Sequence, residues 1–203
     1  DDWALLPTRP DWADGLRENW TPGEAGAHAR LETFVNDHLV DYHRRDEPAV
    51  PATSRLSPHL RFGEFSWNIL YHFPQLHREN YRPAFDNFPW QKPDAATLTA
   101  WQDGRTGIPL VDAGMRELWR SGYMHNRVRM VVASFLIKNL LVDWRIGEAW
   151  FWDTLVDADE ANNPASWQWV AGSGADAAPY FRVFNPELQA SKFDPDNQYI
   201  RAW

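Results

Sequence analysis

The sequence predicts an all-α domain, and two observations support that prediction. Apolar residues recur at helical spacing over several segments, and no stretch shows the strict alternation of a half-buried strand. The chain has 203 residues, of which 44% are hydrophobic, so it is long enough to bury a core. No internal repeat is visible, and a single helical domain accounts for most of the length.

The clearest helices lie in the second half of the chain. Residues 110–121 form one predicted helix, which Gly122 ends because glycine readily adopts the left-handed conformation of a helix C-terminus. Residues 124–144 form a second, with apolar side chains along one face, and 147–156 form a third. The segment 157–186 contains Asn-Asn-Pro, Gly-Ser-Gly and Ala-Ala-Pro, so we expect it to be largely loop.

The first half is more often interrupted. Residues 1–22 are rich in tryptophan and proline with little periodicity, which is typical of a linker or arm. A helix is expected to begin near Thr21, which can serve as its cap, and Pro22 suits the first turn. Residues 44–53 are charged and contain prolines, which indicates a loop, and residues 74–97 are irregular for the same reason.

Composition narrows the possible classes of function. The formal net charge of −8 argues against nonspecific wrapping of nucleic acid, although arginines clustered between 116 and 129 allow a local basic groove. The absence of cysteine excludes disulfides and thiolate metal sites. No apolar run is long enough to span a bilayer and no secretory pattern opens the chain, so we expect a soluble cytoplasmic protein without membrane partners.

Tryptophan is the outlying residue type, with 13 copies against six tyrosines and three methionines. A core rich in large aromatic side chains is the simplest explanation, because tryptophan buries much apolar area. Stacking surfaces for a planar ligand, or indoles that carry electrons, are the functional alternative. Composition alone favours the packing explanation.

One short segment, 157–169, brings carboxylates, amides and indoles together. Carboxylates two residues apart could bind calcium, but the glycine and the distal glutamate of an EF-hand loop are missing, and we expect no metal site. Carboxylates and amides beside aromatic rings suit the polar edge of a planar heterocycle and a ribose hydroxyl. The residues concerned are Asp157, Asp159, Asn162, Asn163, Trp167 and Trp169.

A second group lies on the predicted helix 124–144. Asn126, Arg129 and Met130 are spaced i, i+3 and i+4, so they share one edge of the helix beside its apolar face. Such a flank often only meets solvent, and a ligand-binding edge is the alternative.

A third group is the hydroxyl cluster at Thr53, Ser54 and Ser57. A hydroxyl-rich helix start is usually only a cap, and a cradle for phosphate is its functional alternative. Neither the Rossmann nor the P-loop glycine pattern is present, so these residues offer no nucleotide site of those two kinds.

Five motifs occur in the order found in DNA photolyases and cryptochromes, and the likeness covers about 12–203. By this resemblance the fold is the helical FAD-binding domain of that family at 23–203, preceded by a linker at 1–22. The motifs are Thr53-Ser54-Arg55-Leu56-Ser57, 106–116, 124–130, 143–145 and 157–169, continued by 177–186 and 192–194.

The resemblance implies that the domain binds FAD in a bent conformation. Asn163 would face flavin N5, where its amide can follow the change in N5 protonation between redox states. The pyrophosphate side would be held by Tyr42, Thr53, Ser54, Leu56 and Ser57, and the remainder of the cofactor by Asn126, Arg129, Asp157, Asp159 and Asn163.

The implied activity is light-driven repair of cyclobutane pyrimidine dimers in UV-damaged DNA, by electron transfer from reduced FAD. The damaged dinucleotide would be flipped out of the duplex into a pocket above the flavin. Trp169 would stack on the dimer, and the pocket would be lined by Asn126, Arg127 and Met130.

Three indoles match the family's electron relay: Trp167 next to the flavin, Trp144 in the middle and Trp90 at the surface. Taken singly, each is more simply explained by core packing. A cryptochrome-like photoreceptor is the alternative function, because cryptochromes keep both the FAD and these tryptophans.

The sequence departs from the family in two places. In the family an α/β antenna domain precedes the flavin domain, whereas this sequence begins in the linker. We therefore expect these residues to bind no antenna pigment. We also expect a monomer. After Glu64, relatives continue through a stretch that ends in Trp-Arg-Glu-Phe, whereas Phe65 follows here at once. We therefore expect a segment to be missing at the 64/65 join, which in relatives carries residues near the flavin and the substrate.

Overall fold

The computed structural model describes residues 13–62, 79–174, 177–179 and 181–203, and it confirms the all-α prediction. Within these ranges the one β-type pairing is an isolated bridge between Gln91 and Val142. No helix there is long and apolar enough to cross a membrane. The elements are α1 (Asp14–Asn19), α2 (Glu24–Thr33), η1 (Phe34–His38), η2 (Leu39–Arg44), α3 (Ser57–Arg61), η3 (Pro83–Phe85), α4 (Ala95–Gln102), α5 (Pro109–Ser121), α6 (Asn126–Ser134), η4 (Phe135–Asn139), α7 (Trp144–Thr154), α8 (Asn162–Ala171), α9 (Pro186–Phe193) and α10 (Gln198–Ala202).

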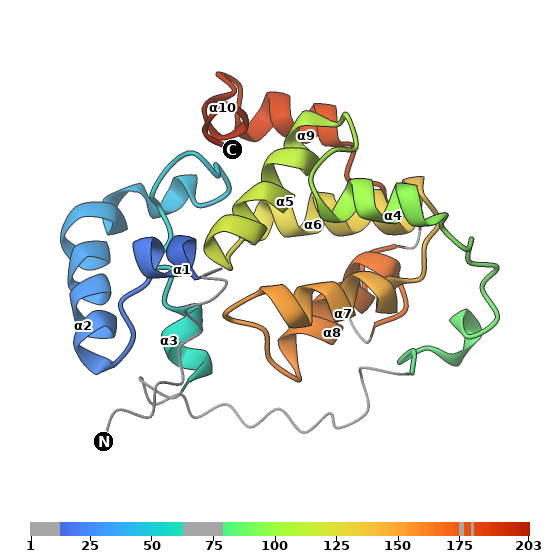
Figure 1. Cartoon of the computed structure of the whole chain (residues 1–203), viewed down its shortest axis with the longest axis horizontal. Helices are drawn as coiled ribbons and strands as arrows, with labels where there is room; N and C mark the ends of the chain where they lie inside the picture. Colours follow the sequence, from blue (N-terminus) through green and yellow to red (C-terminus); the bar gives the residue numbers. More distant parts are fainter. Residues whose placement is uncertain (1–12, 63–78, 175–176, 180) are drawn as a thin grey trace.

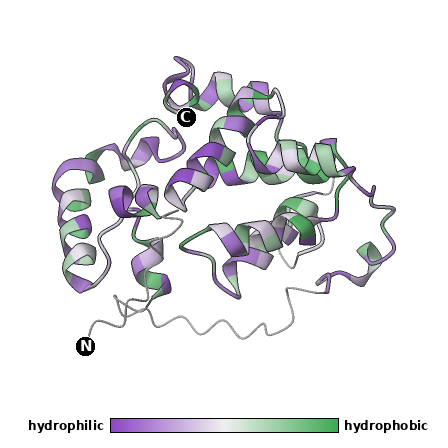
Figure 2. Cartoon of the chain, in the orientation of Figure 1, coloured by the Kyte–Doolittle hydropathy of each residue, from purple (hydrophilic) through white to green (hydrophobic). Residues whose placement is uncertain are grey.

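Helices α5 to α8 form the centre of the molecule, with α5 and α6 on one side and α7 and α8 on the other (Figure 1). Hydrophobic residues are dense along α6 (Figure 2). The buried apolar side chains form one cluster, in which the tryptophans are core residues. Its fully buried members include Trp101, Leu118, Val131, Leu136 and Trp144.

Helix α5 confirms the helix predicted at 110–121. Pro109 occupies its first turn, where a missing N–H costs nothing. Gly122 follows in the left-handed conformation, with a φ of 66°, and its N–H donates to the carbonyl oxygen of Leu118 at 2.8 Å. Local signals therefore determine both ends of this helix.

The helix predicted at 124–144 is shorter than expected. α6 continues into the π-turn η4, and helical geometry ends before Leu141, which has a φ of 55° that non-glycine residues seldom adopt. The N–H of Gln91 donates to the carbonyl oxygen of Leu141 at 2.8 Å, next to the bridge with Val142. A tertiary pairing thus interrupts a segment whose apolar periodicity runs on.

The loop predicted over 157–186 is wrong at its centre, because α8 occupies ten of these residues. Asp159 lies just before the helix and accepts the backbone N–H of Asn162, the first helical residue, at 2.7 Å. Pro164 lies in the first turn, where proline is tolerated, and Gly172 ends the helix with a φ of 95°. The proline therefore marks a helix start and not a loop.

Residues 13–62 form a group of short helices beside α5 (Figure 1). Part of the linker predicted at 1–22 is helical, because α1 occupies Asp14–Asn19. This helix packs on α5. Gly15 lies so close that a Cβ there would be 2.0 Å from the carbonyl oxygen of Arg120. Only glycine permits this approach.

Helix α2 has Gly23 at its cap position, with no side-chain cap, so the expected capping by Thr21 does not occur. Two further expectations lie outside the described residues. These are the conformation of 1–12 and the join between 64 and 65.

Candidate functional site

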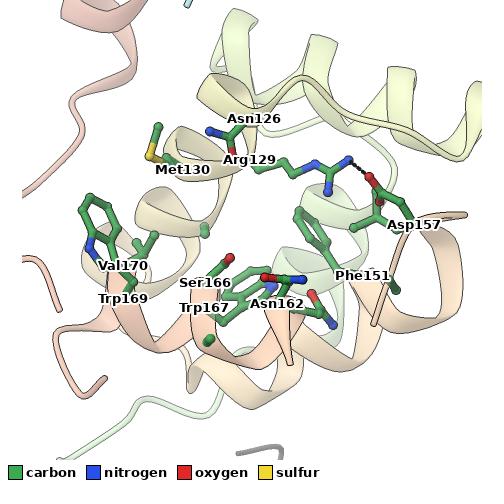
Figure 3. Close-up of a pocket in the computed structure, with 15 residues that line it drawn as sticks. Asn126, Arg129, Met130, Phe151, Asp157, Asn162, Ser166, Trp167, Trp169 and Val170 are labelled. Carbon is green, nitrogen blue, oxygen red and sulfur yellow. Dashed lines mark hydrogen bonds and ion pairs between the residues drawn. The ribbon is translucent and has the colours of Figure 1, made fainter. Parts of the chain in front are cut away.

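A cavity of about 380 Å³, the first cavity, lies between α6, α7, α8 and the loop that joins the last two (Figure 3). A volume of this order is typical of small-molecule sites. The lining combines apolar walls with a few polar groups. The residues are Asn126, Arg129, Met130, Ala133, Phe151, Leu155, Asp157, Ala158, Asn162, Asn163, Ala165, Ser166, Trp167, Trp169 and Val170.

An ion pair stands at one end of the first cavity. Nη2 of Arg129 donates to Oδ2 of Asp157 at 2.9 Å, and the Asp157 side chain is only 4% exposed (Figure 3). Nε of Arg129 donates to the carbonyl oxygen of Met124 at 2.6 Å, which fixes the guanidinium. Oδ1 of Asp157 is buried and accepts nothing from the described residues. Such an oxygen requires a donor, and a ribose hydroxyl or a ring N–H would supply one.

The amide of Asn163 is oriented by Glu148. Its Nδ2 donates both to the carbonyl oxygen of Glu148 at 3.1 Å and to Oε1 of that residue at 2.9 Å. Both side chains are buried. Because the donor end of the amide faces Glu148, the acceptor oxygen is left for the first cavity, which Asn163 lines.

Trp167 forms the floor of the first cavity from within the core. Its ring lies edge-to-face against Phe151, with centroids 5.0 Å apart, and it is 2% exposed. Gly147 on α7 permits this packing, since a Cβ there would be 2.2 Å from a ring atom of Trp167.

The other two predicted relay tryptophans belong to the same core. Trp144 is fully buried, and its indole N–H donates to Oδ1 of Asn80 at 3.0 Å. Trp90 is half-buried and packs on the same cluster. The next residue, Gln91, forms the isolated bridge to Val142. The fold thus gathers three tryptophans that are far apart in the sequence.

Trp101 is a residue that sequence reasoning missed. It is fully buried, and its ring lies 6.5 Å from that of Trp167 in an edge-to-face arrangement. It also stacks on Phe151 with centroids 6.4 Å apart. No motif marks Trp101, and its helix alone gives no signal of this neighbour.

Three of the four residues predicted to contact substrate line the first cavity. Met130 and Trp169 lie on the side of the cavity opposite Asp157, and Asn126 is beside Arg129 (Figure 3). Arg127 does not line this cavity.

Arg127 is directed elsewhere, although it follows Asn126 in the sequence. Its Nη2 is 2.7 Å from Oδ2 of Asp46, and its guanidinium lies 4.4 Å from the ring centroid of Phe193. Neighbouring helix positions face different directions, which explains the separation.

A second cavity, of about 500 Å³, lies between α2 and the segment that precedes α3. It contains Thr53 and Ser54, two of the five residues predicted for the pyrophosphate side. It is also lined by four residues that the sequence did not predict as site residues: Arg30, Thr33, Arg55 and His125. Two guanidinium groups among hydroxyls suit an anionic group.

Charges in the second cavity influence one another. Burial lowers the pKa of Arg30, and the nearby positive charge of Arg55 lowers it further. Burial also lowers the pKa of His125 to about 4, so this imidazole is neutral at pH 7. Two like charges that face one cavity are stabilised by an anion between them.

Four other predicted cofactor residues line neither cavity. Tyr42 is exposed on η2, with the guanidinium of Arg45 5.1 Å from its ring centroid. Asp159 lies just before α8, and both its oxygens accept from Asn162, the first residue of that helix. Leu56 and Ser57 stand at the start of α3.

In the part of the chain that the structure describes, no three His, Cys, Asp or Glu side chains are grouped as metal ligands would be.

Comparison with known proteins gives one consistent result. The profile of the FAD binding domain of DNA photolyase matches residues 56–203. The deoxyribodipyrimidine photo-lyase of Agrobacterium fabrum is 51% identical, over all of this chain and 49% of that protein. The crystal structure of a bacterial class III photolyase from Agrobacterium tumefaciens has a TM-score of 0.92 at 51% identity, and covers 99% of this chain and 48% of that one. Cryptochrome-2 of Arabidopsis thaliana is 38% identical over 93% of this chain and 37% of its own length.

The chain belongs to the photolyase and cryptochrome family. The resemblance inferred from the five motifs is therefore confirmed, and so is the helical FAD-binding fold. The chain spans about half the length of the curated relatives it matches. FAD is the cofactor of this domain, and the unpartnered oxygen of Asp157 in an apolar cavity fits its polar edges.

Proposed function

We propose that this chain is the flavin-binding half of a photolyase that repairs cyclobutane pyrimidine dimers in DNA. One observation carries the proposal. The first cavity combines an indole floor at Trp167, an unpartnered carboxylate oxygen at Asp157 and, on the opposite side, Met130 and Trp169. The isoalloxazine ring of a flavin is a planar group that such a cavity suits, and Met130 and Trp169 offer an apolar surface for a flipped dinucleotide.

Reduced FAD, when bound, supplies a light-absorbing one-electron donor to the dimer. The chain's own residues bind and orient. Arg129 and Asp157, which pair with each other, would hold the ribose and the heterocycle edge, and Asn163, oriented by Glu148, would present its acceptor oxygen to N5. Trp169 would stack on the dimer. Its ring packs on that of Phe184, with centroids 6.0 Å apart, and Met130 lines the same cavity.

The tryptophans provide a route for electrons through the core. One electron would pass from Trp90 through Trp144 and Trp167 to light-excited oxidised flavin, and an external reductant would restore Trp90. Burial of Trp144 and Trp167 supports this route, because it keeps water from the intermediate sites. The half-buried position of Trp90 suits exchange with a reductant.

Repair under blue light of an oligonucleotide that contains one thymine dimer tests the activity. Trp169→Ala should lower the repair rate at least tenfold, with FAD absorbance retained on the purified chain. Trp119→Ala is the matched control, because Trp119 is 71% exposed and stacks on Trp150 outside the first cavity. Equal rates for the two variants would remove the substrate role of Trp169.

The electron route has a separate test. Trp167→Phe should abolish photoreduction of bound FAD in the presence of an external thiol, with the flavin still bound. Photoreduction at the wild-type rate would refute the route.

A cryptochrome-like photoreceptor is the second candidate, favoured by the 38% identity to cryptochrome-2 of Arabidopsis thaliana. Both candidates require FAD and photoreduction, so the repair assay separates them. Photoreduction without repair by the wild-type chain would favour the photoreceptor.

A further inference from the structure

Two adjacent residues at the start of α6 face different cavities. His125 lines the second cavity and Asn126 lines the first. The ring of Tyr123 lies close to a guanidinium from each side, with Arg55 at 4.5 Å and Arg129 at 5.1 Å from its centroid. The two cavities therefore meet at this point of the fold.

A buried carboxylate stands at the same place. Glu117, near the end of α5, has a side chain that is 2% exposed. Its Oε1 accepts from Nη2 of Arg55 at 2.9 Å, and its Oε2 accepts the phenolic O–H of Tyr199 at 2.5 Å. Oε2 also accepts the backbone N–H of His125 at 3.2 Å. One side chain thus joins the segment before α3, the start of α6 and helix α10.

All three partners of Glu117 are donors, which matters for any substitution. Burial raises the pKa of this carboxyl, and the donors Tyr199 and Arg55 oppose that rise. An ionised carboxylate can accept from every one of them, because both of its oxygens are acceptors. An amide cannot, since its nitrogen would face a donor.

Arg55 has a backbone conformation that its side chain helps to hold. Its φ is 51°, in the left-handed region that non-glycine residues seldom adopt. The guanidinium is fixed by Glu117 and by the ring of Tyr123. The residues just before it, Thr53 and Ser54, line the second cavity, so their placement depends on this arrangement.

We propose that Glu117 is a positioning residue for the cofactor. Through Arg55 it holds Thr53 and Ser54 where the diphosphate of FAD binds, and through the N–H of His125 it fixes the start of α6. It therefore keeps the two cavities aligned, so that one bent FAD molecule can occupy both. This inference rests on the proposed placement of FAD across the two cavities.

Glu117→Gln tests the inference, because the positioning role and simple electrostatics predict opposite changes in FAD affinity. The substitution removes a negative charge near the site of an anionic diphosphate, so electrostatics alone predicts tighter binding of FAD. The positioning role predicts weaker binding, because the amide cannot serve both Arg55 and the donors at Oε2. We expect the dissociation constant for FAD, measured by flavin fluorescence on the flavin-stripped chain, to rise at least tenfold.

Tyr199→Phe is the matched control, because it removes one donor from Oε2 and leaves the bond to Arg55 intact. It should lower the urea midpoint of the flavin-free chain, with FAD affinity within twofold of wild type. Glu117→Asp is the second variant. It keeps the charge but shortens the reach, so it should weaken FAD binding as well, and it serves if the glutamine variant does not fold.

Three outcomes are distinguishable. Unchanged or tighter FAD binding by Glu117→Gln, or by Glu117→Asp where that variant serves, overturns the positioning role. Tyr199→Phe that weakens FAD binding as much as Glu117→Gln also overturns it, because the effect would then follow general stability. A wild-type chain that binds no FAD, with its helical circular dichroism intact, refutes the proposed function and this inference together.

Discussion

Helices α5 to α8 and residues 13–62 are held in the fold by different means. The central helices bury large apolar side chains completely, among them Trp144, Leu136 and Val131. In the N-terminal segment 13–62, the buried apolar side chains are small, those of three alanines and Pro58. Large apolar side chains of that segment are exposed instead, and Val40 is 79% exposed.

Polar and aromatic contacts attach the N-terminal segment to the core. The indole N–H of Trp20 donates to the carbonyl oxygen of Ser121 at 2.6 Å. Arg55 bonds to Glu117 on α5 at 2.9 Å, and its guanidinium lies 4.5 Å from the ring centroid of Tyr123. Each contact depends on orientation, whereas the burial that stabilises the core does not.

The difference has a consequence for the site. Apolar burial stabilises in proportion to area, so the first cavity is built into the most resistant part of the chain. The second cavity is lined by the N-terminal segment 13–62, with His125 at the start of α6 as the one lining residue from the core, and we expect this segment to open at a lower free energy. The two cavities should therefore respond differently to substitution.

The largest effect is expected from Arg129→Met, which tests the polar contact inside the core. The change leaves the buried carboxylate of Asp157 without its partner, so the free energy of unfolding should fall by about 4 kcal/mol. Urea denaturation measures this loss. Arg120→Met, which removes an exposed arginine paired with Glu18, should leave the value nearly unchanged. A similar small change for both variants would contradict the prediction.

Gly147→Ala tests the apolar packing of the core. A Cβ at this position would be 2.2 Å from a ring atom of Trp167 and 2.7 Å from a methyl of Leu136, so α7 or the indole must move. Such overpacking should lower the free energy of unfolding by about 3 kcal/mol. Ala149→Ser, on the exposed face of α7, should change it by about 0.5 kcal/mol in the same urea experiment. A urea midpoint for Gly147→Ala equal to that of the wild type would contradict the prediction, because the core would then have room for the added methyl group.

The stability of the chain should fall in acid because of His125, which lies at the junction between the two regions. Its pKa is about 4 in the folded chain, because the ring is buried, and about 6.5 when unfolded. Above pH 6.5 the imidazole of His125 is neutral in both the folded and the unfolded chain, so it does not lower the free energy of unfolding. As the pH falls towards 4, the unfolded chain takes up a proton that the folded chain does not, so stability is lost.

At pH 4.5 this loss should be about 2.5 kcal/mol relative to neutral pH. His125→Asn keeps a capping side chain and removes the titration, so its urea midpoint should fall less between pH 7.5 and pH 4.5. Parallel pH profiles for the two proteins would refute the assignment of this loss to His125.

The smallest effect is expected from Trp20→Phe, which probes the attachment of the N-terminal segment. The substitution removes the hydrogen bond to the carbonyl oxygen of Ser121, worth about 1 kcal/mol. Amide hydrogen exchange should accelerate in α1 and α2 but not in α6. Uniform acceleration through both regions would show that they open together.

The sequence predicted the parts of the site that depend on local spacing. The i, i+3, i+4 relation of Asn126, Arg129 and Met130 placed them on one helix edge, and the structure directs all three to the first cavity. Residues 157–169 were recognised by their composition. The end of α5 followed from Gly122, because the left-handed residue that ends a helix is a local property.

Other features depended on contacts between distant segments. α8 was predicted as loop because its proline and amides suggested a turn, while burial of Trp167 and Gln168 stabilises it as a helix. The helix from α6 ends where Gln91 pairs with Leu141, and no local signal marks that position.

By itself the sequence determined the helical class, the family and the chemical types gathered in 157–169, because spacing and residue type are local properties. Only the tertiary structure decided that Trp101 meets Trp167, that Arg127 turns to Asp46, and that Glu117 joins Arg55 to the start of α6. These contacts link residues far apart in the chain. They form because apolar burial decides how the helices pack, and that packing decides which buried polar groups lie close enough to pair.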